Sequence, residues 1–390
     1  MGIQVNGNTD IISAADGGLT IDGTTNFSTL QVNSQNLPNA GSLSNRNLTI
    51  NGDMRIAQRG TAAVTTSGYP VDRWIQGFST AGAVSSQQST SVTPDDFGYS
   101  IACTVTTVDA STDAADQWNI QQHIEGYNVE QLLFGTANAK DVTVSFWVRG
   151  SVTGTYCMTL LGSSDGSTID RSRVSEYTIN TANTWEYKTI TVPGDTGGTW
   201  TTDNGRGLSV RFGLTAGSDF QQSTGSWGNT NAVGSANQTQ LLETLNATWY
   251  VTGVQLEVGT VATPFEHRSF GDELARCQRY YEKSYDIGDA PGTANGRGAA
   301  ATRRAGGSEG ATVFNDSFKV RKRDIPNIVW YNPNNGTSGQ IHNISVGAIT
   351  VTGTSTSAPT SETKPGAPTH AGNGSQAQII VGHWTADAEL

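Results

Sequence analysis

Apolar and polar residues alternate in three long stretches in the middle of this chain. In 142–149 every second residue is apolar, and the positions between them hold Thr, Ser and Trp147. The same alternation recurs in 207–214 and in 248–258, where Tyr250 has the parity of the apolar positions. Because successive side chains of a strand point to opposite faces, each stretch predicts a half-buried β-strand. Polar turn clusters separate the stretches, as they separate the strands of a β-sandwich.

A helical repeat interrupts this pattern at 271–283. Asp272 and Glu273 stand near its start and Lys283 at its end, which is the order of charges that the helix dipole favours. A helix this short is stabilised mainly by packing against other elements. We therefore expect it to close one end of a sandwich or to join two domains.

Strand-like runs continue beyond the helix and predict a second, smaller β-sandwich. Two polar segments between them, 286–312 and 354–376, are rich in small residues and are expected to be long loops. Loops on a rigid scaffold often carry recognition, so we expect both to contribute to a binding surface. The strand-like runs lie at 313–323, 327–331, 340–352 and 377–384.

The first 45 residues differ from the rest because they contain no Trp or Tyr. Their short apolar pairs lack the bulk for a core of their own, so they should pair with other copies of the chain or with a docking protein. The whole chain, at 390 residues, also exceeds the roughly 250–300 residues that one core supports. We predict an all-β protein in four parts: an N-terminal anchoring and oligomerising segment at 1–45, a β-sandwich domain at 46–270, a linking helix at 271–285 and a C-terminal β-sandwich domain at 286–390.

Charge and hydropathy exclude two classes of partner. The net charge of −11 argues against nucleic acid, which requires clustered Lys and Arg. No apolar run approaches the roughly 20 residues that span a bilayer, and the start lacks a signal-peptide pattern, so we expect a protein that is made in a cytoplasm and does not insert into a membrane. The three cysteines, widely spaced and odd in number, are expected to be reduced and buried.

Four motifs resemble a group of tailed-bacteriophage fibre and virion structural proteins. The first is NLTINGDMRIAQRG at 47–60, followed by YPVDRW at 69–74. The second is TWYVTGVQLEVG at 248–259, which continues into ATPFE at 262–266. The last two are CQRYY at 277–281 and HWTADAEL at 383–390. The resemblance covers 46–390.

This resemblance implies a fold, a location and a partner. The fold is a jelly roll similar to carbohydrate-binding modules, joined to a smaller β-domain. The location is a virion, assembled in the host cytoplasm, with residues 1–45 attached to a tail or capsid protein. The assembly implied is a homotrimer, and the expected partner is a host surface polysaccharide or lipopolysaccharide.

Aromatic residues in polar surroundings are the candidate glycan-binding side chains. A flat apolar ring can stack on a sugar while neighbouring polar groups bond its hydroxyls. Trp200 and Trp227 lie in Gly-rich loops and are the first candidates, with Trp185 and Tyr187 as further ones. The alternative is that each ring covers a core edge or a subunit seam.

Two groups of charged residues suggest other sites. The cluster Lys319, Arg321, Lys322 and Arg323 could meet an acidic polysaccharide, or it could be the charged edge of a strand. Related jelly rolls often hold a structural calcium where strand ends meet, and the carboxylates for such a site would be Asp53, Asp72 and Glu257. Asp72 could instead pair with Arg73. No other cofactor is expected.

The expected function is adsorption rather than catalysis. The five histidines have no serine or cysteine nucleophile motif around them, so we predict that the chain is not an enzyme. The leading hypothesis is a fibre or spike subunit that attaches to the particle through its N-terminal segment and binds host glycan. The alternatives are a capsid or tail decoration without recognition and, less favoured, a tailspike that cleaves glycan with paired carboxylates.

Overall fold

The computed structural model describes residues 31–32, 35–36, 45–304, 310–311, 314, 316–345, 347–354, 359–370 and 378–390. The chain divides into two compact units, Met1–Ala40 and Gly41–Leu390. In the first unit, β1 (Gln31–Val32) and β2 (Gln35–Asn36) pair antiparallel. The other strands expected within 1–45 lie outside the described residues.

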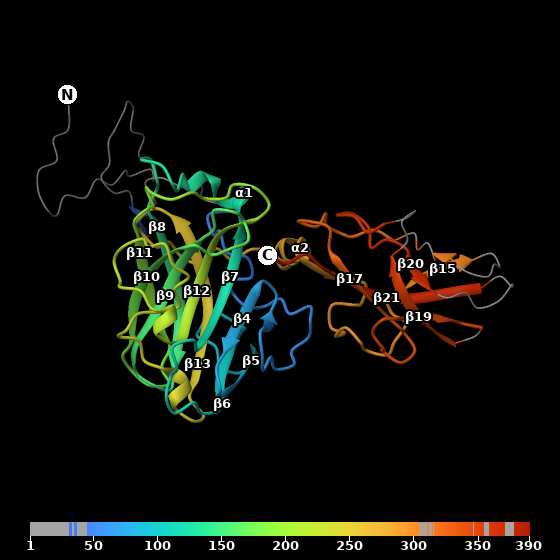
Figure 1. The fold of residues 1–390 in the computed structure, drawn as a ribbon, viewed down its shortest axis with the longest axis horizontal. Coiled ribbons are helices and arrows are strands. Elements are labelled where there is room, and N and C mark those ends of the chain that lie inside the picture. Colours follow the sequence, from blue (N-terminus) through green and yellow to red (C-terminus); the bar gives the residue numbers. More distant parts are fainter. Residues whose placement is uncertain are drawn as a thin grey trace, which may run out of the picture. The chain divides into compact units, whose positions relative to one another are not determined.

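Two antiparallel sheets form the body of the second unit (Figure 1), which confirms the predicted all-β class and β-sandwich. The six-stranded sheet has the order β10-β9-β12-β7-β4-β3. Its strands are β3 (Gly68–Val71), β4 (Trp74–Ser79), β7 (Gln117–Glu125), β9 (Gly154–Gly162), β10 (Arg171–Ile179) and β12 (Arg206–Ala216). The five-stranded sheet has the order β11-β8-β13-β6-β5. Its strands are β5 (Ala83–Ser89), β6 (Ser100–Thr107), β8 (Val142–Gly150), β11 (Glu186–Val192) and β13 (Thr248–Val258).

Short helices occupy some of the connections between these strands. They are α1 (Gly126–Val129), η1 (Glu130–Leu132), η2 (Ser218–Phe220) and η3 (Leu241–Glu243). None is long enough to form a layer of its own, so the sandwich is closed by the side chains of its two sheets.

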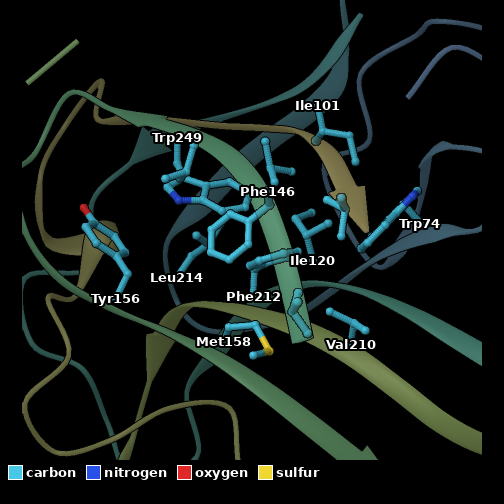
Figure 2. Close-up of a cluster of buried hydrophobic side chains, with 14 of the residues drawn as sticks. Trp74, Ile101, Ile120, Phe146, Tyr156, Met158, Val210, Phe212, Leu214 and Trp249 are labelled. Atoms are coloured by element: carbon cyan, nitrogen blue, oxygen red, sulfur yellow. The ribbon is translucent and has the colours of Figure 1, made fainter. Parts of the chain in front are cut away.

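A cluster of aromatic rings fills the space between the two sheets (Figure 2). Phe212 of β12 lies at its centre, with ring centroids 4.9 Å from Phe146, 5.6 Å from Trp249 and 6.2 Å from Trp74. All four side chains have no exposed surface. Phe146 and Phe212 lie at apolar positions of the predicted alternation, which brings their rings inward from strands that lie far apart in the chain.

The structure corrects two details of the predicted strands. Thr143 and Ser145 of β8 are buried, because the segment that follows β13 covers this part of the outer face and Gly259 accepts a 2.8 Å hydrogen bond from Thr143 Oγ1. A register shift between Thr252 and Gln255 reverses the alternation in β13. Trp249 and Val251 therefore enter the core, and Tyr250 lies on the opposite face of the strand from the one predicted.

The predicted helix exists but is shorter than expected. α2 (Phe270–Gln278) begins at Ser269, whose side chain accepts a hydrogen bond from the backbone of Asp272. It ends at Gln278, and Tyr281–Lys283 forms the strand β14 instead of a last helical turn. Consecutive Tyr280 and Tyr281 are both buried, which an amphipathic helix does not provide but strand pairing with the C-terminal region does.

One long strand, β21 (Gln378–Asp387), organises the C-terminal region. Its first half pairs with β15 (Ala300–Arg304) and β18 (Gln340–Asn343), and its second half with β14 and β17 (Asn327–Tyr331). The network extends through β19 (Gly347–Thr354), β20 (Pro368–His370) and β16 (Gly310–Ala311). A separate core fills this region, formed by Phe314, Phe318, Trp330, Ile341, Ile349, Ile380, Trp384 and Ala386.

The predicted strand at 313–323 is wrong over its described part, 314 and 316–323, which has no strand structure. Lys322 turns inward there to reach Glu282, a partner that local sequence does not reveal. The two segments predicted as loops are also partly strands, since β15 and β16 lie in the first and β20 in the second. These short strands form because they pair with segments distant in the chain, so local alternation in the sequence does not predict them.

Cys103, Cys157 and Cys277 are free and buried, as predicted. Burial raises the pKa of Cys103 to about 12 and that of Cys157 to about 11, and it raises the pKa of Cys277 as well. Because the thiolate is the reactive form, we expect no labelling of the native protein by a thiol reagent at pH 8 and full labelling in urea. Absorbance of the released chromophore measures this. Rapid labelling without urea would contradict the burial of these thiols.

Candidate glycan-binding site

Four aromatic side chains gather on the outer face of the five-stranded sheet. Trp147 and Tyr187 are register partners on β8 and β11, and Tyr250 on β13 is the partner of Arg149 on β8. Trp185 comes directly before β11. Trp147 and Arg149 alternate with the core residues of β8, so they face away from the sandwich interior. We call these five residues, Trp147, Arg149, Trp185, Tyr187 and Tyr250, the aromatic platform.

The rings of the aromatic platform contact each other in two pairs and remain at least partly accessible. The centroids of Trp147 and Tyr187 are 5.4 Å apart, and those of Trp185 and Tyr250 are 6.3 Å apart. Tyr187 is 45% exposed and the other three rings are half-buried. The guanidinium carbon of Arg149 is 5.3 Å from the centroid of Tyr250. A contiguous group of exposed rings is typical of a binding surface or a subunit contact.

A glycine joins the aromatic platform to a second group of rings. Gly253 has a φ of +61°, and a Cβ atom there would lie 2.7 Å from Phe97 and 3.1 Å from Trp147. Only glycine allows both rings this close to the backbone. The ring of Phe97 is 5.2 Å from Phe265 and 5.6 Å from His267. The β13 bulge thus extends the aromatic surface from Trp147 to Phe97.

Trp200 and Trp227, the first candidates from the sequence, form a packed cluster with Phe134. The ring of Trp200 is 4.9 Å from Phe134 and 5.4 Å from Trp227. Each indole nitrogen is bonded within the chain, Trp200 to Asp195 at 3.1 Å and Trp227 to the Pro193 carbonyl at 3.0 Å. Both rings pack against the main core and are half-buried. Their contacts are those of rings that cover a core edge, which was the alternative to glycan binding considered for these residues.

The sandwich also has two pockets, one polar and one mostly apolar. One, of about 440 Å³, is polar, and Glu176 in it accepts a 2.6 Å hydrogen bond from Ser235. The other, of about 140 Å³, is mostly apolar and adjoins Trp200. Hydroxyl and amide groups in the first could bond a sugar, but no aromatic residue lines it. Its lining residues are Glu176, Ser218, Gln221, Gln222, Ser223, Thr224, Ser235, Ala236 and Asn237.

The four cations at 319–323 do not form one surface patch. Lys322 is fully buried, and its ammonium lies 2.6 Å from the carboxylate of Glu282. Arg323 donates to the backbone carbonyls of Asn204 at 2.8 Å and Ala388 at 2.9 Å. Arg321 pairs with Glu362 at the surface, and Lys319 is exposed. Two of the four positive groups therefore hold the fold together instead of facing a ligand.

The three carboxylates proposed for calcium belong to separate networks. Asp53 pairs with Arg55 at 2.6 Å, and Glu257 accepts hydrogen bonds from the backbone and hydroxyl of Thr263. Asp72 is buried, which raises its pKa, and it lies 3.7 Å from Arg59. It does not pair with Arg73, which holds Glu389. Within the described ranges, no three acidic, His or Cys side chains are arranged to hold a metal.

The candidate residues predicted from the sequence include part of the aromatic platform but not all of it. Trp185 and Tyr187 were named as candidates, and the structure brings them together with Trp147 and Tyr250. Trp147 could have been found as a large ring at a polar-face position of an alternating strand, although the same argument points to Trp249, which lies in the core. Tyr250 could not, because the bulge that turns it outward leaves no local signal in the alternation.

No family model matches this chain, and no curated protein matches it. Solved structures with similar folds include tailspike protein 4 of bacteriophage CBA120, at 13% identity and a TM-score of 0.28. That match covers 55% of this chain and 21% of the tailspike chain. They also include the family 11 carbohydrate-binding module of cellulase Lic26A-Cel5E from Clostridium thermocellum, at 15% identity and a TM-score of 0.27, covering 54% of this chain and 99% of the module. A xylan-binding CBM22 domain from Paenibacillus barcinonensis matches at 11% identity and a TM-score of 0.23, covering 53% of this chain and all of that one.

Similarities this weak do not define a function, so the case for one rests on this chain's own residues.

Among the residues that the structure describes, no helix is long and apolar enough to cross a membrane.

Proposed function

We propose that this chain is a non-enzymatic, glycan-binding subunit of a tailed-bacteriophage particle, either a fibre or a surface spike. The aromatic platform is the main structural observation that supports glycan binding. The four sequence motifs that resemble phage virion proteins support the location, with residues 1–45 as the attachment segment. The partner would be a polysaccharide or lipopolysaccharide on the host surface.

The aromatic platform has the chemistry of a sugar-binding surface. Sugar rings present apolar C–H faces that can stack on Trp and Tyr, and Tyr187 and Arg149 add polar groups for hydroxyls. The five residues include no carboxylic acid, so the platform itself has no general acid or nucleophile for glycoside cleavage. Binding without catalysis is the activity that these side chains support.

Assembly would strengthen a weak contact with each glycan. We propose a homotrimer, because the aromatic-poor segment 1–45 needs partners to bury its apolar residues. Linked sites can raise the overall affinity by about 10²–10⁴ without any new contact at each one. An adhesion subunit can therefore rely on a shallow aromatic surface.

Replacing Trp147 with alanine tests the proposal. We expect binding to host cells or to an isolated host polysaccharide to weaken by about tenfold or more, since loss of a central aromatic anchor costs upwards of about 1–2 kcal/mol. Biolayer interferometry on the full-length protein measures this. The matched control is Tyr127→Ala, which removes a ring that is 60% exposed and belongs to α1 rather than to the platform.

Each outcome of this test has a defined meaning. Weaker binding by Trp147→Ala with normal thermal unfolding, beside unchanged binding by Tyr127→Ala, supports the platform as the glycan site. Equal binding by all three proteins moves the site elsewhere, with the polar pocket at Glu176 next to be tested. A wild-type protein that binds no host glycan favours a decoration without recognition.

A further inference from the structure

Arg149 stands within the aromatic platform without a carboxylate partner. Its Nε donates a 2.8 Å hydrogen bond to the Asn183 carbonyl, and its guanidinium lies beside the ring of Tyr250. Among the described residues it forms no ion pair, although the chain has 34 acidic residues and only 23 Lys and Arg. The two terminal amino groups of this side chain remain available to a ligand.

Three other arginines, Arg171, Arg279 and Arg211, bind groups of the protein itself. Arg171 holds Asp195 through two nitrogens, at 2.6 and 2.7 Å, and Arg279 holds Glu125 at 2.9 Å. Arg211 lacks a carboxylate but donates to Gln121, at 2.8 Å, and to two further oxygen atoms. These guanidinium groups serve the fold. Arg149 has one internal hydrogen bond and stands among accessible rings, which is the arrangement of a ligand-binding arginine.

Two contacts fix the direction of the Arg149 side chain. The Asn183 carbonyl holds Nε, and the ring of Tyr250 supports the guanidinium plane. A held guanidinium loses less freedom on binding, and its planar fork matches a carboxylate better than an ammonium does. A ligand that stacks on these rings and pairs with the guanidinium needs an apolar face and a negative charge at one edge. A sugar with a carboxylate substituent has this shape.

We propose that the aromatic platform takes acidic glycans and that Arg149 binds the carboxylate of a uronic-acid type sugar while the neighbouring rings stack on the sugar faces. This inference rests on the proposed glycan-binding function and adds the ligand class and the residue that selects it. The overall charge of −11 does not prevent such binding. At physiological ionic strength, charges farther away than about 8 Å are largely screened, so the nearest cation dominates.

The experiment uses an array of paired glycans: polygalacturonate, alginate and hyaluronate, each printed beside its carboxyl-reduced form. Full-length wild type should bind at least one acidic member about tenfold more tightly than its reduced partner, the value expected of one charge-assisted contact. Arg149→Gln should lose this preference and keep the affinity for the reduced form. Arg149→Lys should keep part of it, because a lysine retains charge but not the fork. Arg276→Gln, at a half-buried arginine of α2 that donates to Asn45 at the surface, should behave as wild type.

The remaining outcomes overturn the inference in distinguishable ways. Equal binding to both members of every pair, or an unchanged preference in Arg149→Gln, removes the acidic-glycan assignment while the proposed function stands. Binding to no glycan on the array also removes the acidic-glycan assignment, and only a failure to bind host cells or host polysaccharide as well removes the proposed function. A lower assembly mass for Arg149→Gln by light scattering identifies this face as a contact between copies of the chain, which also removes the assignment.

Discussion

Replacing Arg73 with methionine is expected to lower the free energy of unfolding by about 3–5 kcal/mol, the usual cost of removing one partner of a buried ion pair. Arg73 is 2% exposed and pairs with Glu389, which is 6% exposed. The same guanidinium donates to the His123 carbonyl and lies 3.4 Å from the ring centroid of Tyr280. Without it, the buried carboxylate of Glu389 keeps only its longer contact with Arg59, at 3.4 Å, and the His123 carbonyl loses this donor. Urea denaturation followed by tryptophan fluorescence measures the change.

The position of Arg73 explains why the effect should be large. His123 belongs to β7 of the sandwich, Tyr280 follows α2, and Glu389 follows β21, so one side chain joins three segments that are distant in the chain. Loss of this connection should also separate the unfolding of the C-terminal region from that of the sandwich. Arg276→Met is the matched control and should stay within about 0.5 kcal/mol, because this half-buried arginine is in no ion pair with a described residue and its hydrogen bond to Asn45 is exposed. A loss of less than 1 kcal/mol in Arg73→Met, on the same scale, would contradict the assigned role.

Phe212→Ala should cost about 3–5 kcal/mol of unfolding free energy, since it removes a whole aromatic side chain from a packed core. Phe212 has no exposed surface and touches Trp74, Phe146 and Trp249, which come from both sheets (Figure 2). Relaxation cannot easily fill the cavity, because the surrounding rings are held by strands in two different sheets. Thermal and urea unfolding both report the loss.

A surface ring provides the comparison for this core substitution. Tyr127 is 60% exposed, and Tyr127→Ala should change the unfolding free energy by less than about 0.5 kcal/mol. Similar stability for the two variants would mean that the cluster around Phe212 does not hold the two sheets together. A large loss in Phe212→Ala alone would identify it as the main contact between them.

The all-β class and several strands were predictable because strand alternation is a local property. The runs at 142–149 and 207–214 correspond to β8 and β12, and 327–331 coincides with β17. In each case the apolar set faces a core and no irregularity breaks the period. The helix start was predictable for a similar reason, since Ser269, Asp272 and Glu273 form a local N-terminal signal. Its end was not, because Tyr281 joins a strand more than 100 residues away in the chain.

The candidate site was only half visible in the sequence. Aromatic residue type alone pointed to Trp185 and Tyr187, but it also pointed to Trp200 and Trp227, whose rings pack into the fold. Packing against the core separates these two pairs, and packing depends on which loops cover which strands. Gly253 shows this most clearly, since a bulge at one glycine turns Tyr250 outward and lets Phe97 approach Trp147.

Residue type and local spacing were enough to predict the period of the strands, many residues of the sandwich core and the net charge, because these are local properties. Only the folded chain shows which charges serve the fold and which remain free. Lys322 and Arg323 looked like a surface cluster, yet the first is buried against Glu282 and the second is bonded to carbonyls of distant segments. Arg149 looked like one more polar-face residue of a strand. It became the free cation of an aromatic surface because strand pairing across the sheet set Tyr250 beside it and placed no carboxylate within reach.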